Sequence, residues 1–197
     1  GGLMFIIGII VAFVIGALTF TLSGGKLESD YASVLVGRDK VLIIAGLCLA
    51  FGCGVIGFTD DFIKIKLKRN EGLTAKQKSF GQLVMALGYT ATLWLSHNTV
   101  WYLPFIGNVN FEKNFITGVV FWLVSIFIIV GCVNSVNLTD GIDGLCSSVT
   151  FTVAITFIIA SVMLKFAGLG IISSALLGGV LGFLCWNWNP AKTFMGD

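Results

Sequence analysis

The sequence has little charge, little proline and almost no histidine. Charged residues make up 11% of its 197 positions, and it contains two prolines and one histidine, His97. A lone histidine between an apolar run and a polar link leaves no material, within these residues, for a Ser-His-Asp triad or a multi-histidine metal site. The few basic residues form no patch with interleaved aromatics, which argues against nucleic-acid binding.

The five cysteines lack the C-x-x-C pairing that is typical of zinc and redox sites. Each lies in or beside an apolar run, at Cys48, Cys53, Cys132, Cys146 and Cys185. We therefore expect them to be small buried hydrophobic side chains, with neither a disulfide framework nor a zinc site.

Glycines within the apolar runs match a nucleotide-binding pattern only superficially. Residues 52–57 read G-x-G-x-x-G, but they lie inside an apolar run and not between a strand and a helix. Close helix packing is the better interpretation, for these residues and for Gly178 and Gly182.

Apolar residues dominate the chain. It is 56% hydrophobic, and its mean hydropathy of +0.97 is typical of a chain dissolved in lipid. This predicts an all-α, polytopic membrane protein with room for about six spans of ~20 residues. The expected spans are 3–22, 41–59, 80–96, 115–133, 145–164 and 169–186.

The polar links between these spans also carry information. The link 97–114 contains Trp101, Tyr102, Pro104 and alternating residues around Gly107, which indicates an interfacial turn or short hairpin with an aromatic belt. The chain begins without an initiator Met and stops without a flanking polar tail, so we expect an incomplete chain. No basic region precedes the first apolar run, so no cleavable signal peptide is expected.

The most unusual stretch is 134–144, at the mouth of the fourth apolar run. If the helix continues through it, Asn134, Asn137, Asp140 and Asp143 recur every three residues along one face. Ionisable groups at membrane depth cost about 2.5 to 3.5 kcal/mol each on insertion scales, so they indicate a functional site. An ordinary Asn/Asp/Gly-rich loop at a helix end is the alternative.

A second acidic motif, Asp60-Asp61, follows the second apolar run. Adjacent residues on a helix point about 100° apart, so one carboxylate is expected to face a ligand and the other to orient or pair. Lys64 and Lys68 lie four and eight positions after Asp60, which predicts a stripe of paired charges. A membrane-edge ion-pair ladder that binds anionic headgroups is the alternative.

Counting the crossings places the acidic motifs on one side of the membrane. With six spans, the ends of the second, fourth and sixth emerge together, carrying Asp60-Asp61, Asp140/Asp143 and Asp197. That side carries seven of the 12 basic residues, against five on the other, so the positive-inside rule makes it cytoplasmic.

The five aspartates form a set of oxygen ligands without a nearby histidine or thiolate pair. Such a set suits Mg²⁺, which takes one or two carboxylates and completes its shell with water and substrate phosphates. Carboxylates, lysines and glycines at a cytoplasmic membrane face therefore suggest phosphoryl transfer. An ion-coupled transporter is a further alternative, although it predicts acidic groups at the bilayer midplane.

Three stretches carry a family resemblance: NLTDGIDGL at 137–145, DDFIKIKLKRNEGLTAKQK at 60–78 and NWNPAKTFMGD at 187–197. They resemble the phospho-N-acetylmuramoyl-pentapeptide transferase (MraY) family of the polyprenyl-phosphate N-acetylhexosamine-1-phosphate transferase superfamily. The resemblance implies a multi-pass enzyme of the bacterial inner (cytoplasmic) membrane. It would convert UDP-N-acetylmuramoyl-pentapeptide and undecaprenyl phosphate to lipid I and UMP, with Mg²⁺ required. Residues 1–197 would be one transmembrane helical domain, a fragment of a bundle of about ten spans.

The resemblance also assigns roles by position. Asp60, Asp61 and Asp197 match the family's catalytic aspartates, and Asp197 its magnesium ligand. Substrate-binding roles are implied for Lys64, Lys68, Lys76, Asn137, Asp140, Asp143, Asn187 and Phe194. The lysines would lie near the diphosphate, and Asn187 and Phe194 on the nucleoside side. Phe194 could instead be an interfacial anchor.

The family's His-rich loop and its Lys and Thr near the nucleotide have no counterpart in these residues. A sister transferase that uses UDP-N-acetylglucosamine therefore stays open, as does a homodimer.

Overall fold

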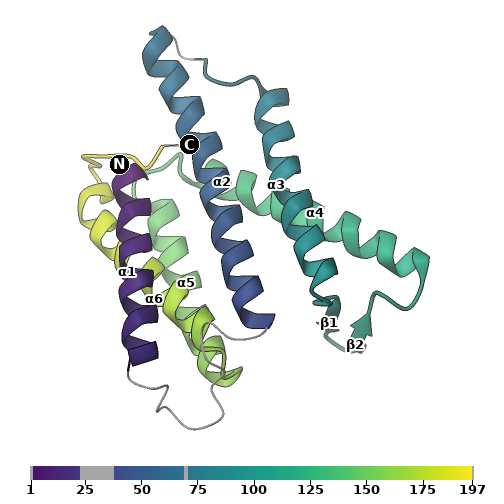
Figure 1. Ribbon diagram of the computed structural model, residues 1–197. Coiled ribbons are helices and arrows are strands. Elements are labelled where there is room, and N and C mark those ends of the chain that lie inside the picture. The colour runs from purple at the N-terminus through teal and green to yellow at the C-terminus, as the bar shows by residue number, and fades with distance from the viewer. Residues whose placement is uncertain (1, 23–37, 69–70, 197) are drawn as a thin grey trace. The chain divides into compact units, whose positions relative to one another are not determined.

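The computed structural model describes residues 2–22, 38–68 and 71–196 (Figure 1). In these ranges the chain forms six helices and one two-stranded sheet. The helices are α1 (Gly2–Leu22), α2 (Arg38–Leu67), α3 (Ala75–Leu95), α4 (Phe115–Thr139), α5 (Leu145–Met163) and α6 (Ala167–Asn187). The strands are β1 (Val100–Leu103) and β2 (Gly107–Asn110). The predicted all-α class is confirmed.

Five of the helices are long and apolar enough to cross a membrane, as judged over the described residues. They are α1, α2, α4, α5 and α6. The third expected span forms the helix α3, but it falls short of that threshold because polar residues such as Lys78 and Gln82 occupy its first half. Many large apolar side chains on the spanning helices are exposed, among them Phe51 and Phe127, as is normal for helices whose solvent is lipid.

The chain divides into two compact units, residues 1–43 with 136–197 and residues 44–135. In the first unit α6 packs against both α1 and α5 (Figure 1). The rings of Phe5 and Phe183 lie 6.0 Å apart at one end of the α1–α6 pair. At the other end, Ile171 meets Gly16. The two helices are therefore antiparallel, and the start of α1 lies beside the end of α6.

Small residues allow the close helix packing in each unit, although not all of the predicted ones contribute. Gly179 receives Phe5 and Ile9 of α1. No described atom lies within 4 Å of the position that a Cβ would take at Gly178 or Gly182, so the described residues show no close packing at these two glycines. Gly52 packs against Met85 of α3, which confirms the interpretation for this glycine of the motif.

In the second unit α3 runs antiparallel to both α2 and α4. Ile56 of α2 packs on Gly81 of α3, one helical turn from the contact between Gly52 and Met85. Gln82 exchanges hydrogen bonds with Asn134 of α4, 2.9 Å and 3.3 Å long. The rings of Trp94 and Phe121 pack at a tilt, with centroids 5.8 Å apart. These two α3–α4 contacts are separated by about 18 Å on each helix, so within residues 44–135 the part of α4 near Asn134 lies at the same end of the unit as the end of α2.

The link between α3 and α4 forms the predicted hairpin. β1 pairs with β2 in antiparallel register, from Val100 opposite Asn110 to Leu103 opposite Gly107. Gly107 adopts a left-handed φ of 90°, which favours glycine. The rings of Trp101, Phe111 and Phe121 pack against one another in edge-on and tilted arrangements, with centroids 4.9 to 5.7 Å apart.

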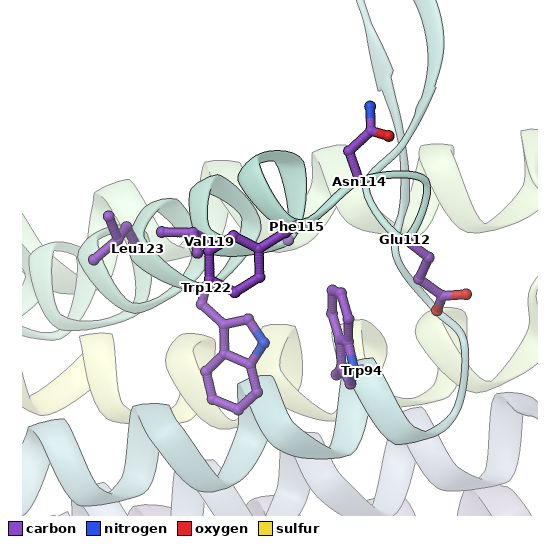
Figure 2. A pocket seen from close by; sticks show the side chains of 8 residues that line it. Trp94, Glu112, Asn114, Phe115, Val119, Trp122 and Leu123 are labelled. Carbon is purple, nitrogen blue, oxygen red and sulfur yellow. The ribbon is translucent and has the colours of Figure 1, made fainter.

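Beside the hairpin, a cavity of about 430 Å³ opens between α3 and α4. Figure 2 shows the side chains that line it, among them Phe115 and Trp122 of α4 and, across a gap from Trp122, Trp94 of α3. Aromatic rings are common where a membrane helix reaches the membrane–water interface. None of the residues that line the cavity is one of the predicted site residues.

The cysteines differ from the expectation that all of them are buried. All five cysteines are free, but only Cys146 is buried, whereas Cys48, Cys132 and Cys185 are exposed on their helices. Within the described part of the chain, the buried hydroxyls of Thr90 and Ser125 have no hydrogen-bond partner.

Candidate active site

Asp60 and Asp61 lie inside α2, which continues to Leu67 and does not end before them. The helix thus continues past Thr59, where the apolar run was expected to end, and it places Asp60, Asp61 and Lys64 at helical positions, as expected. Lys64, one turn later, bridges both carboxylates, with Nζ 2.6 Å from Asp60 Oδ2 and 3.3 Å from Asp61 Oδ1. The expected pairing of Asp60 with Lys64 is confirmed.

The two aspartates differ in exposure. The Asp60 side chain is 5% exposed and the Asp61 side chain 38%. Asp60 Oδ1 accepts a 2.6 Å hydrogen bond from the Leu73 backbone N–H. One oxygen of Asp60 therefore holds the link to α3 while the other holds Lys64, and Asp61 is the more accessible member of the pair.

The link that Asp60 holds leads directly into α3. A Cβ at Gly72 would lie 2.7 Å from Asp60 Cγ and from its carbonyl oxygen, so only glycine fits there without a shift. Thr74 then caps α3: its hydroxyl accepts from Gln77 N, and Gln77 Oε1 accepts from Thr74 N. Asp60, Gly72, Leu73 and the cap together fix where α3 begins.

The other two predicted lysines, Lys68 and Lys76, lie outside α2. Lys76 lies exposed in the first turn of α3. Lys68 follows the end of α2 and has a left-handed φ of 49°, so it does not extend the helical stripe from Asp60. The stripe of paired charges predicted through Lys68 is therefore limited to Lys64.

The central motif is partly helix and partly turn. α4 continues through Asn134 and Asn137 and ends at Thr139. Asp140 and Asp143 lie in the turn that joins α4 to α5, so the conditional prediction of one helical stripe holds only for the two asparagines. Gly144 ends this turn with a left-handed φ of 72°, immediately before α5. The turn arises because Gly141 and Gly144 interrupt the helical run.

Two side chains tie this turn to the segment after α6. Asn187 is 1% exposed, and its Oδ1 accepts from Gly144 N at 3.0 Å and from Ser147 Oγ at 3.1 Å. Its Nδ2 donates to Thr193 O at 3.0 Å. Asp143 Oδ2 accepts from Ala191 N at 3.0 Å. Two motifs more than 40 residues apart in the sequence are thereby joined.

Phe194 lies in this joined segment and is 53% exposed, which is compatible with either of its predicted roles. Asp197 lies outside the described residues. The roles assigned to these residues, and the convergence of all five aspartates on one pocket, stay predictions.

Sequence reasoning missed several supporting residues. Ser147 and Gln82 are buried polar side chains in helices, and their partners become known only from the tertiary structure. The Thr74–Gln77 capping box was visible as a T-x-x-Q pattern directly before α3.

These observations define an all-α, multi-pass membrane protein. At one end of each helical unit lie the acidic and amide side chains that the sequence assigns to a functional site. The sequence profile described as Glycosyl transferase family 4 matches residues 42–197. The chain belongs to this family.

Curated bacterial relatives agree. A phospho-N-acetylmuramoyl-pentapeptide-transferase of Desulforamulus reducens is 41% identical over 199 residues, covering 100% of this chain and 54% of the relative. Another protein of that name, from Carboxydothermus hydrogenoformans, is 45% identical over 162 residues, covering 80% of the chain and 49% of the relative. A third, from Desulforudis audaxviator, is 36% identical over 202 residues, covering 100% and 56%. The chain spans about half the length of these relatives, and the predicted resemblance is confirmed.

Proposed function

We propose that the complete protein transfers phospho-N-acetylmuramoyl-pentapeptide from UDP to undecaprenyl phosphate, giving lipid I and UMP in peptidoglycan synthesis. The observation that carries this proposal is the 41% identity, across the whole chain, to a relative named for that transfer. The acidic and basic side chains at the helix ends support it, because phosphoryl transfer depends on positioning and on charge neutralisation. The site would lie on the cytoplasmic face of the inner membrane.

Mg²⁺ is part of the proposal, with Asp197 as its ligand. Among the described residues, no three His, Cys, Asp or Glu side chains form a cluster that could hold a metal ion. An all-oxygen set nevertheless fits Mg²⁺, since this ion needs only one or two protein carboxylates beside substrate phosphates and water. When bound, it would neutralise charge on the diphosphate.

The surroundings of Asp60 favour a one-step transfer. A phosphate monoester with a second pKa of ~6 is about 90% dianionic at pH 7, so a base has little left to remove. Asp60 is buried, and each of its oxygens already has a partner. Oδ1 accepts from the Leu73 N–H, and Oδ2 pairs with Lys64 Nζ. In this proposal the lipid phosphate attacks the sugar diphosphate directly, while Asp60 holds Lys64 and the link to α3 in position. Trapping a covalently phosphorylated Asp60 in single-turnover quenching would contradict this step.

The test is UMP release by the complete protein in detergent or nanodiscs, with undecaprenyl phosphate and each candidate UDP-sugar. Turnover with UDP-N-acetylmuramoyl-pentapeptide, and none with UDP-N-acetylglucosamine, is the expected result. The reverse preference would identify the sister transferase instead. Absence of turnover with every donor would refute the proposal.

A further inference from the structure

The buried side-chain amide of Asn187 connects two segments of the first unit. The family resemblance assigns this residue to the nucleoside. Its side chain, however, is 1% exposed and is bonded at both ends. Its oxygen holds the start of α5 through Gly144 and Ser147, and its nitrogen holds the segment after α6 through Thr193.

We propose that Asn187 is a positioning residue: it locks the turn 140–144 to the segment 188–196, so that Phe194 and the carboxylates of the turn keep one fixed arrangement. This inference rests on the proposed function for its kinetic consequence. Its structural content, the lock itself, stands on the geometry alone.

Two further contacts support a lock between these segments. Asp143 Oδ2 accepts from Ala191 N at 3.0 Å, so the turn also holds the segment from its own side. The Lys192 N–H bonds back to Trp186 O at 2.8 Å, which folds the segment against the end of α6. Gly144 suits the turn at this point because its φ of 72° lies in the left-handed region that favours glycine.

Ser147 allows the positioning role of Asn187 to be tested separately from a direct contact between Asn187 and a ligand. It is 1% exposed and bonds the same Asn187 oxygen from beneath, so it cannot touch a substrate at the surface. Ser147→Ala should loosen Asn187 without removing any group that could face a ligand. Thr152→Ala is the matched control, because this exposed hydroxyl on the same helix bonds only to the carbonyl of Ser148.

The first measurement is hydrogen–deuterium exchange of the complete protein without substrates. Asn187→Ala should speed exchange in peptides that cover both 140–144 and 188–196, and Ser147→Ala should do so to a smaller extent. Thr152→Ala should leave both peptides unchanged. Exchange that stays at the wild-type rate in Asn187→Ala would overturn the lock. If Asn187→Ala does not fold, Ser147→Ala still decides the question.

The second measurement is steady-state kinetics. Losing a hydrogen bond of ordinary net strength corresponds to about a fivefold change. We expect Ser147→Ala to raise the KM for the UDP-sugar by about that factor and Asn187→Ala by more, with the KM for undecaprenyl phosphate unchanged. The double variant should be no worse than Asn187→Ala, because both act through one element. If the effects of the two substitutions on the KM for the UDP-sugar are additive, or if Ser147→Ala leaves this KM unchanged, Asn187 contacts the UDP-sugar directly and the positioning role is refuted. A wild-type protein without turnover would refute the proposed function, while the exchange result still tests the lock.

Discussion

Replacing Gly72 by alanine would place a methyl group against the buried carboxylate of Asp60. The new Cβ would lie 2.7 Å from Asp60 Cγ and from its carbonyl oxygen, roughly 0.8 Å short of a contact of about 3.5 Å. The turn would have to move away by about that amount. The 2.6 Å bond from Leu73 N to Asp60 would then stretch to about 3.4 Å, outside the range of a good hydrogen bond.

This displacement has a thermodynamic and a kinetic consequence. The Asp60 side chain is 5% exposed, so water cannot replace the lost bond, and hydrogen bonds to charged groups contribute about 1.5 to 3 kcal/mol. We expect Gly72→Ala to destabilise the protein by about 2 to 3 kcal/mol. A shift near 1 Å at a catalytic centre can lower the rate by about 10²-fold, so UMP release should fall by one to two orders of magnitude.

The assay compares thermal unfolding in detergent and UMP release for Gly72→Ala and Gly88→Ala. Gly88 lies in α3, and no described atom is within 4 Å of the position of its Cβ. Alanine there should keep full activity and stabilise the helix by up to about 1 kcal/mol. Wild-type turnover and an unchanged unfolding midpoint in Gly72→Ala would refute the role assigned to the Asp60–Leu73 contact.

Three further predictions concern other parts of the chain. Asp197→Asn should abolish Mg²⁺-dependent turnover in a folded protein, and unchanged activity at saturating Mg²⁺ would contradict the ligand role. Phe194→Ala should weaken UDP-sugar binding by about 1 to 3 kcal/mol and lipid binding much less; equal losses in titrations of both would indicate a structural role. Thr90→Val should stabilise the protein by about 1 kcal/mol, because its buried hydroxyl lacks a partner in the described part of the chain. A lower midpoint in thermal unfolding would count against that reasoning.

Much of the fold was predictable because membrane helices are defined by local composition. The apolar runs gave all six helices, and the pattern around Gly107 indicated the hairpin that β1 and β2 form. The ends of α2 and α4 were less predictable. Both helices continue beyond their apolar runs, to Leu67 and Thr139, because polar side chains are tolerated where a helix leaves the lipid.

By itself the sequence determined the class of protein, the family resemblance and the identity of the polar residues, since each of these depends on residue type and on short spacing. Only the tertiary structure decided what those side chains do: Asp60 holds Leu73, and Asn187 is buried between Gly144 and Thr193. The physical reason is that a hydrogen bond depends on distance and direction in space. Asn187 and Gly144 are 43 positions apart in the chain, so no local pattern records that they meet.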